Sequence, residues 1–291
     1  MEHAGGGSRS RLVKGHRYSL SVVLGSAALA AVAFMLVPTV ASAAPMGSAH
    51  SLNQRGAPHG GATNSNLVDH GGPVLSSSRP YAIWWGSPST WTGTDIKTGL
   101  ASFFSGLNGS SYVNTAEQYM RGATLSVAAS SSVADTSAPP KKVNPSTLGN
   151  EVQREVNTQS LPLDPTGIYF VFTSNAPSGG SFCAWHSYAA VGGATVSVVY
   201  VPNISSIGGC LVPGASHGDT PLTQSLANIT AHEFMEAITD PFVSAWYDTS
   251  HSEIGDKCAW QFGSAVTLAN GSIWQLQEEW SNLAHGCVQT T

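Results

Sequence analysis

The residues with the clearest chemical potential form one short pattern, His232-Glu233-Phe-Met-Glu236. In an α-helix, residues four apart lie on one face, so the imidazole of His232 and the carboxylate of Glu236 can take two positions on one divalent cation. Glu233 stands where a His-Glu-x-x-His metallopeptidase carries its general base. The pattern therefore predicts a metal site in which Glu replaces the second His and Glu233 is the catalytic residue.

Acidic residues are concentrated around this pattern in a chain that is otherwise poor in charge. Charged residues make up 10% of the 291 residues, against about 25% in an average protein. Six of the 17 acids lie between Glu233 and Asp256. Crowded carboxylates repel one another unless a cation or hydrogen bonds compensate them. We expect Glu253 or Asp256 to supply a third metal ligand, with His186 as a further candidate.

The ligand types favour zinc as the metal, with calcium as the alternative. Imidazole and carboxylate both bind zinc, but the harder Glu at the second position also suits calcium or manganese. In a purely structural interpretation, Glu236, Asp240 and Asp256 cap helix and turn backbones while His232 donates hydrogen bonds in the core. Geometry separates the two, because ligand atoms more than about 5 Å apart exclude a tetrahedral zinc site with bonds of about 2 Å.

The helix that carries the pattern is predicted at residues 221–239, with Thr220 as N-cap and Pro221 at its first position. Short apolar runs rich in β-branched and aromatic residues predict strands at 167–173 and 195–201, which we expect at the sheet centre. Alternating strands and helices predict an α/β or α+β fold. We expect a single domain with a central mixed sheet and a zincin-like helix carrying the HExxE pattern.

The N-terminal region predicts export. A basic segment precedes an almost wholly apolar run at residues 18–40, which ends in the Ala-Ser-Ala sequence typical of a signal-peptidase site. We expect residues 1–43 to be a cleaved signal peptide, 44–66 a flexible linker and 67–291 the folded domain. An uncleaved membrane anchor is the alternative interpretation of the apolar run.

The charge and the cysteines agree with export. Cleavage would leave 8 basic and 16 acidic residues, a net charge of −8, and with no basic stripe we expect no nucleic-acid partner. Cys183, Cys210, Cys258 and Cys287 all follow the signal segment. An even number of cysteines outside the cytosol favours disulfides. Of the three pairings, we prefer the sequential one, which closes the shortest loops.

Several segments of residues 67–291 keep the order found in a known protein family. They are His70–Leu75, Tyr81–Gly86, Gly167–Ser174, Phe182–His186, His232–Glu236, Asp240–Pro241, Ala245–Tyr247, Glu253–Cys258 and Trp280–Asn282 before Cys287. In these segments the chain resembles the phosphate-induced/EXORDIUM family of secreted proteins, known mainly from plants and with bacterial relatives. The resemblance implies an extracellular or cell-wall protein linked to growth and nutrient responses, without an established biochemical activity.

Together these observations predict a secreted, metal-dependent hydrolase of the metallopeptidase kind. His232 and Glu236 would hold the divalent metal, with Glu253 or Asp256 completing the shell. Glu233 would activate a water for hydrolysis of an extracellular peptide. The alternative is a non-enzymatic extracellular or cell-wall binding protein. In it the same acids would hold a structural calcium ion or only hydrogen bonds, and a groove would engage wall polysaccharide or another protein. A membrane partner is expected only if the signal segment stays uncleaved.

Overall fold

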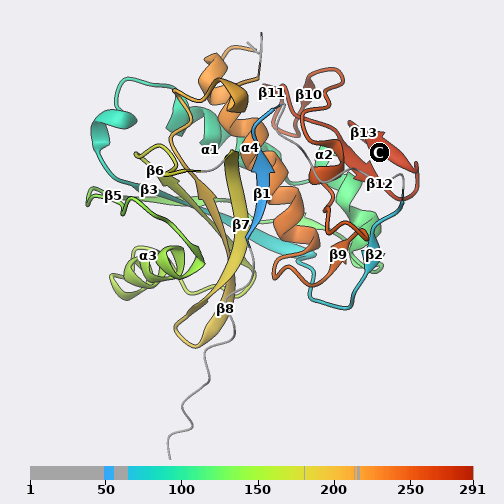
Figure 1. Ribbon diagram of the computed structural model, residues 1–291, viewed down its shortest axis with the longest axis horizontal. Helices are drawn as coiled ribbons and strands as arrows, with labels where there is room; N and C mark the ends of the chain where they lie inside the picture. Colours follow the sequence, from blue (N-terminus) through green and yellow to red (C-terminus); the bar gives the residue numbers. More distant parts are fainter. Residues whose placement is uncertain (1–48, 56–64, 180, 213, 215–216, 291) are drawn as a thin grey trace, which may run out of the picture. The chain divides into compact units, whose positions relative to one another are not determined.

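The computed structural model describes residues 49–55, 65–179, 181–212, 214 and 217–290 (Figure 1). The predicted signal peptide lies outside these residues. The strands are β1 (His50–Asn53), β2 (Val68–Asp69), β3 (Ser77–Trp85), β4 (Ser126–Val127), β5 (Ser131–Asp135), β6 (Gly167–Thr173), β7 (Phe182–Val191), β8 (Ala194–Val201), β9 (Trp246–Tyr247), β10 (Val266–Thr267), β11 (Ile273–Trp274), β12 (Glu279–Ser281) and β13 (Gly286–Val288). The α-helices are α1 (Ile96–Gly106), α2 (Ser111–Asn114), α3 (Pro145–Asn157) and α4 (Pro221–Thr239), and the 3₁₀-helices are η1 (Pro88–Thr90), η2 (Thr115–Tyr119), η3 (Gly208–Cys210) and η4 (Asp256–Cys258).

A mixed seven-stranded sheet organises the domain. Its order is β1-β7-β8-β6-β3, and β4 and β5 both pair with the remaining edge of β3. Strands β3, β4, β5, β6 and β8 run parallel to one another, whereas β7 is antiparallel to β8 and β1 is antiparallel to β7. All seven residues of β6 are buried, as expected for a central strand covered on both faces. The mixed α/β fold and the two central strands are therefore confirmed.

The two faces of the sheet are covered by different helices. Because side chains alternate along a strand, Ile168 and Phe170 face one core cluster while Tyr169 and Val171 face the other. The first cluster contains residues of α1 and α4, and the second contains residues of α3 (Figure 1). In β7, Ala184 belongs to the first cluster, whereas Trp185 and Ala189 belong to the second. This parity places His186 on the α4 side of the sheet.

Helix α4 begins and ends where the sequence predicts. The side chain of Thr220 accepts a hydrogen bond from the amide of Thr223 at 3.3 Å, and Pro221 fits the first turn, where its missing N–H costs nothing. Every residue from Thr223 to Thr239 is buried, so polar side chains in this helix must find partners inside the protein.

Within the described residues, no helix combines the length and the apolar character needed to cross a membrane.

Two disulfides join the segments around the sheet. Cys183 of β7 is bonded to Cys210 of η3, and Cys258 of η4 is bonded to Cys287 of β13. The sequential pairing is therefore confirmed. The disulfides fit an extracellular or otherwise oxidising environment.

The prediction of a flexible linker over residues 44–66 is wrong for residues 50–53. These residues form β1, whose Leu52 is fully buried in the core and lies opposite Ala184 of β7. Burial of the Leu52 side chain and the backbone hydrogen bonds to β7 stabilise β1, although the residues on either side of it have a composition typical of a linker. The rest of the predicted linker lies largely outside the described residues. The folded domain thus includes a strand that precedes residue 67.

Candidate metal centre

Helix α4 aligns the His232 and Glu236 side chains on one face. His232 Nε2 lies 3.1 Å from Glu236 Oε1, one helical turn away. Both side chains are fully buried, as is that of Glu233. The chelating arrangement that the spacing predicts is therefore present in the helix. Its burial means that any cation there would be largely separated from bulk water.

The loop after α4 brings Asp256 and Glu253 back to this face. Asp256 begins η4, and its amide donates to Glu236 Oε1 at 3.1 Å, while the amide of Glu253 donates to Asp256 Oδ2 at 3.3 Å. Asp256 Oδ1 lies 3.9 Å from His232 Nε2. A Cβ on Gly255 would lie 2.6 Å from His232 Nδ1, so only glycine allows this close approach.

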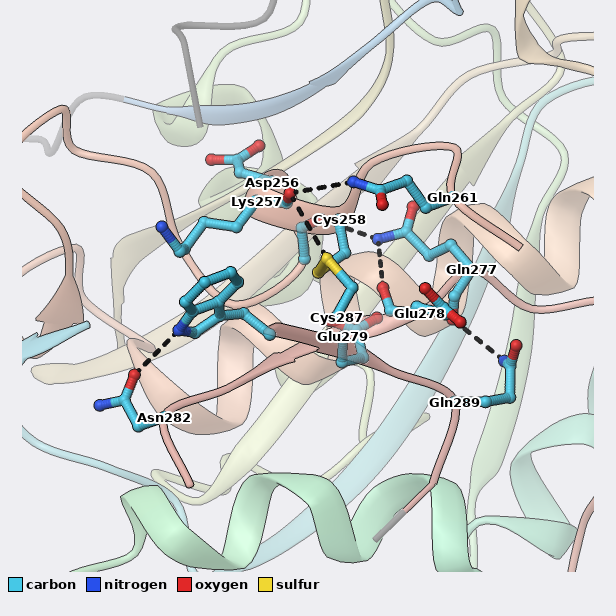
Figure 2. The surroundings of a disulfide bond; sticks show 12 residues. Asp256, Lys257, Cys258, Gln261, Gln277, Glu278, Glu279, Asn282, Cys287 and Gln289 are labelled. Carbon is cyan, nitrogen blue, oxygen red and sulfur yellow. Dashed lines mark hydrogen bonds between the residues drawn. A yellow bond between two sulfur atoms is a disulfide. The ribbon is translucent and has the colours of Figure 1, made fainter. Parts of the chain in front are cut away.

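The loop is fixed by the C-terminal segment. Figure 2 shows Asp256 two residues before Cys258, whose disulfide to Cys287 ties η4 to β13. The Gln277 side chain donates to the Gly255 carbonyl at 2.9 Å, and the amide of Trp280 donates to the Ile254 carbonyl at 3.0 Å. These covalent and hydrogen-bonded links hold the Asp256 carboxylate against α4 without relying on a metal.

His186 projects from β7 into a group of three glutamates. Its Nδ1 lies 3.2 Å from Glu236 Oε2 and 3.5 Å from Glu233 Oε2, and its Nε2 lies 3.6 Å from Glu253 Oε2. The same Nε2 is 3.3 Å from the Asp240 carbonyl. His186 therefore connects α4 to the loop that carries Glu253. It is the residue that the sequence suggests as a further candidate metal ligand.

His50 of β1 completes the group. Its Nδ1 lies 2.8 Å from Glu253 Oε1 and 3.9 Å from Asp256 Oδ2. We refer to the whole set as the α4 cluster, which consists of His50, His186, His232, Glu233, Glu236, Glu253 and Asp256. Sequence reasoning missed His50 because it lies in a Gly/Ser/Ala-rich stretch that is typical of a linker. The spacing of His50 and Leu52, two residues apart as on one face of a strand, was the only local sign of a strand there.

Two groups of three residues within the α4 cluster could hold a metal ion. One is His186, Glu233 and Glu236, and the other is His232, Glu236 and Asp256; in each, ligand atoms lie within 4.8 Å of one another. Glu236 belongs to both, with Oε1 toward His232 and Oε2 toward His186. Three predicted ligands thus share one group. The predicted base Glu233 falls in the other group, and the fourth predicted ligand, Glu253, contacts His186 and His50.

The polar atoms of the cluster are incompletely satisfied by the protein. His232 Nδ1 and Glu233 Oε1 are buried without a hydrogen-bond partner among the described residues, and Glu253 Oε1 faces the imidazole of His50 at 2.8 Å. Glu236 Oε2 and His186 Nδ1 face each other at 3.2 Å, and their hydrogen bond depends on which ring nitrogen carries the proton. Buried polar atoms are rarely left without partners, because each costs about 1–3 kcal/mol. These atoms converge on one region, where the protonation of the imidazoles or a bound cation determines whether the carboxylates are satisfied.

Burial and mutual charge shift the pKa values of the cluster in opposite directions. Burial raises the pKa of Glu233 to about 7 and that of Glu253 to about 8. Burial disfavours the imidazolium of His232, but the carboxylates of Glu236 and Glu233 outweigh it and raise the pKa to about 10. For Glu236, the nearby imidazoles outweigh burial and lower the pKa. Without a metal, the cluster balances its charge with imidazolium ions.

Two other acids near the pattern have structural roles. Asp240 ends α4, and its Oδ1 accepts from the amides of Ser244 at 2.5 Å and Ala245 at 2.7 Å. Asp248 lies 3.0 Å from the Lys257 ammonium. The structural interpretation of the acidic stretch is thus correct for Asp240, and it also fits Glu236 and Asp256, whose carboxylates accept hydrogen bonds from the amides of Asp256 and Glu253, respectively. It does not account for Glu233 Oε1, which is buried without a hydrogen-bond partner among the described residues.

Glu279 is a further buried acid that sequence reasoning did not single out. The Tyr112 hydroxyl donates to its Oε1 at 2.7 Å, and burial raises its pKa to about 8. It lies in neither group of potential ligands.

Comparison with known proteins adds no assignment, since no family model and no curated protein matches the chain.

Proposed function

We propose that this protein is a secreted zinc-dependent peptidase whose metal is held by His232, Glu236 and Asp256. The observation that carries the proposal is the convergence of these ligand atoms, within 4.8 Å of one another, in a region of unpaired buried polar atoms. Ligand atoms around a tetrahedral zinc ion with bonds of about 2 Å are separated by a little over 3 Å. The 3.1 and 3.9 Å separations from His232 Nε2 are close to that value.

The donor set favours zinc over calcium. Calcium takes six to eight oxygen ligands, whereas zinc binds imidazole nitrogen and carboxylate oxygen in a four-coordinate shell. A neutral His232 and the two carboxylates of Glu236 and Asp256 would offset the two positive charges of the ion. A cation bound here would contact His232 and Glu236 at an interior position that no solvent reaches, since both side chains are fully buried.

Glu233 is the residue proposed to handle the proton during hydrolysis. A zinc ion supplies Lewis acidity to the amide carbonyl of a bound peptide. Glu233 would accept a proton from the attacking water and return it to the leaving amine. A pKa raised to about 7 suits both steps, because such a group is readily protonated and deprotonated near neutral pH. His186, 3.5 Å from Glu233 Oε2, would orient the carboxylate.

Export and family membership are parts of the same proposal. The apolar run at residues 18–40 and the two disulfides support secretion. The ordered segments within 67–291 support membership of the phosphate-induced/EXORDIUM family. A peptide in an extracellular or cell-wall setting is then the proposed substrate.

The complete burial of the cluster supports a second candidate function. The side chains of His186, Glu233 and Glu253 are fully inaccessible, and His186 already faces the acids at 3.2 to 3.6 Å. A protein with this interior could be a non-enzymatic extracellular binding protein stabilised by imidazolium–carboxylate pairs. It would then need no zinc, which separates it from the first proposal.

The experiment combines elemental analysis with a matched pair of variants. Protein purified without chelators should contain one zinc per chain, and His232→Ala should lose it. Glu233→Gln should keep the zinc and lose roughly 10²–10⁴-fold in peptide hydrolysis, the usual contribution of a general base. Glu279→Gln, an equally buried change outside both ligand groups, should retain activity. Absence of zinc, or full activity in Glu233→Gln, would overturn the proposal.

A further inference from the structure

Strand β1 occupies the edge of the sheet beside the α4 cluster. It pairs antiparallel with β7, with His50 opposite His186 and Leu52 opposite Ala184. Because these positions share one face of the sheet, His50 and Leu52 both point toward α4. Figure 1 shows β1 alongside β7 and next to α4. A segment distant in sequence from the loop of Glu253 thus reaches the edge of the candidate site.

The contacts of β1 are those of a strand added to the edge of a sheet. Its backbone forms a ladder with β7, and the Asn53 carbonyl accepts from Trp260 Nε1 at 2.8 Å. The Leu52 side chain is fully buried in an apolar position. Main-chain hydrogen bonds with pockets for alternate side chains are the features by which sheet edges recognise added strands. The β7 edge is therefore built to accept a strand whose side chains alternate as those of β1 do.

His50 lies at the most accessible part of the cluster. The side chains of His50 and Asp256 are 15% and 21% exposed, whereas those of His186, His232 and Glu253 are at 0%. Removing the imidazole of His50 would uncover Glu253 and the adjacent Asp256, its neighbours at 2.8 and 3.9 Å. Strand β1 thus covers the side of the cluster that is nearest to solvent.

We propose that the β7 edge is the binding site for an extended peptide strand, and that β1 is the chain's own occupant of it, with His50 closing the metal centre. The inference rests on the proposed function only for the reaction that follows binding; the binding edge itself needs no metal. A tethered strand competes at an effective concentration in the millimolar range, so the intact chain should resist a free peptide. Loosening β1 should open the edge to it.

The test uses a fluorescent peptide with the sequence of residues 49–55, Ala-His-Ser-Leu-Asn-Gln-Arg, and measures its binding to the full chain by anisotropy. Leu52→Ala removes the buried anchor of β1 and should increase the affinity for the peptide at least about tenfold over wild type. Leu148→Ala removes an equally buried leucine from α3, which covers the opposite face of the sheet, and should leave the affinity unchanged. A peptide with Asp in place of Leu should not bind.

Hydrogen exchange of the wild-type protein provides a measurement that needs no variant. Residues 49–55 should exchange at least about tenfold faster than β8 through local opening, which is expected of a displaceable edge strand. Exchange of residues 49–55 at the rate of β8, together with equal peptide affinity in Leu52→Ala and wild type, would show that β1 is a permanent strand and would overturn the inference.

A third measurement separates this inference from the proposed function. His50→Ala should hydrolyse peptides faster than wild type if both are correct. If the peptide binds to Leu52→Ala but no variant contains zinc, the binding edge stands and the peptidase proposal fails. If zinc-dependent hydrolysis is equal in wild type and His50→Ala and the peptide does not bind to Leu52→Ala, the peptidase proposal stands and this inference fails.

Discussion

Two clusters of acidic side chains lie on opposite faces of the sheet, and they are balanced by different kinds of cation. On the α3 side, Arg154 Nη2 lies 2.7 Å from Asp135 Oδ2 and 2.7 Å from Glu151 Oε1, and it also pairs with Glu155. We call these four residues the Arg154 cluster. In the α4 cluster, imidazoles face the carboxylates instead. A guanidinium is always charged, whereas an imidazole can exchange its proton for a metal ion.

The pKa values follow this difference. In the Arg154 cluster, burial opposes ionisation of Asp135, but hydrogen bonds from Ser137 and the charge of Arg154 outweigh it and lower the pKa. In the α4 cluster, burial raises the pKa of Glu253 to about 8. Burial also raises the pKa of Glu151, which Arg154 only partly offsets. A fixed cation thus stabilises charge at Asp135, while the α4 cluster is left with protons that a metal can displace.

The largest expected effect separates the two clusters by their response to zinc. Zinc at about a thousand times its dissociation constant should stabilise the wild-type protein by about 4 kcal/mol, because it binds the folded state alone. Thermal unfolding with and without a chelator measures this. His232→Ala should abolish the zinc response, whereas Arg154→Met should keep it. An undiminished zinc response in His232→Ala would place the metal elsewhere and remove the contrast.

A pH-dependent effect comes next, from Glu279, which interacts electrostatically with His232 of the α4 cluster. Its pKa is raised from 4.5 to about 8 by burial, so the folded protein binds a proton that the unfolded chain releases. The stabilisation is fully present below about pH 4.5 and is lost as the pH rises through 8. Between pH 4.5 and 7, wild type should lose about 3 kcal/mol relative to Glu279→Gln.

Urea unfolding across this pH range measures the difference. The Gln side chain can still accept the hydrogen bond from Tyr112, so the variant tests the charge and not the contact. Parallel pH profiles for wild type and Glu279→Gln would mean that Glu279 is ionised in the folded protein at pH 7. Glu279 would then be ionised in the folded protein, as Asp135 is.

The sequence predicts the parts of this comparison that depend on local pattern. Helical spacing identifies His232 and Glu236, and apolar runs identify the central strands, because both signals lie within a few residues. His50 was missed because its position depends on pairing with β7, more than a hundred residues away. The Arg154 cluster was missed for a related reason: Asp135 reaches α3 only after β5 joins the sheet. Long-range pairing is not encoded in a local window.

A smaller effect is expected on the Arg154 side. Arg154→Met leaves Asp135, Glu151 and Glu155 without their shared cation. Water cannot replace it well, because the side chains of these acids are 8% exposed or less. We expect a loss of about 2 kcal/mol in the free energy of unfolding, below the 3–5 kcal/mol typical of a fully buried pair because the guanidinium itself is 43% exposed. Arg121→Met, which breaks an exposed pair with Asp69, is the control and should cost roughly 0.5 kcal/mol. Equal losses in the two variants would mean that Arg154 acts as an ordinary surface charge.

The smallest effect tests whether Arg154 alone keeps Asp135 ionised. The Ser137 hydroxyl donates to Asp135 Oδ2 at 2.5 Å and accepts from Trp85 Nε1 at 3.0 Å, and its amide donates to Asp135 Oδ1 at 2.8 Å. Ser137→Ala should cost about 1 kcal/mol, and because a hydrogen bond to the carboxylate favours its charged form, the pKa of Asp135 should rise. Chemical denaturation and NMR titration of the Asp135 carboxyl carbon measure the two quantities. An unchanged pKa would mean that Arg154 alone keeps Asp135 ionised. A rise approaching that in Arg154→Met would mean that the neutral donors of Ser137 stabilise the carboxylate about as much as Arg154 does. Neutral hydrogen-bond donors would then share the role that imidazoles have in the α4 cluster.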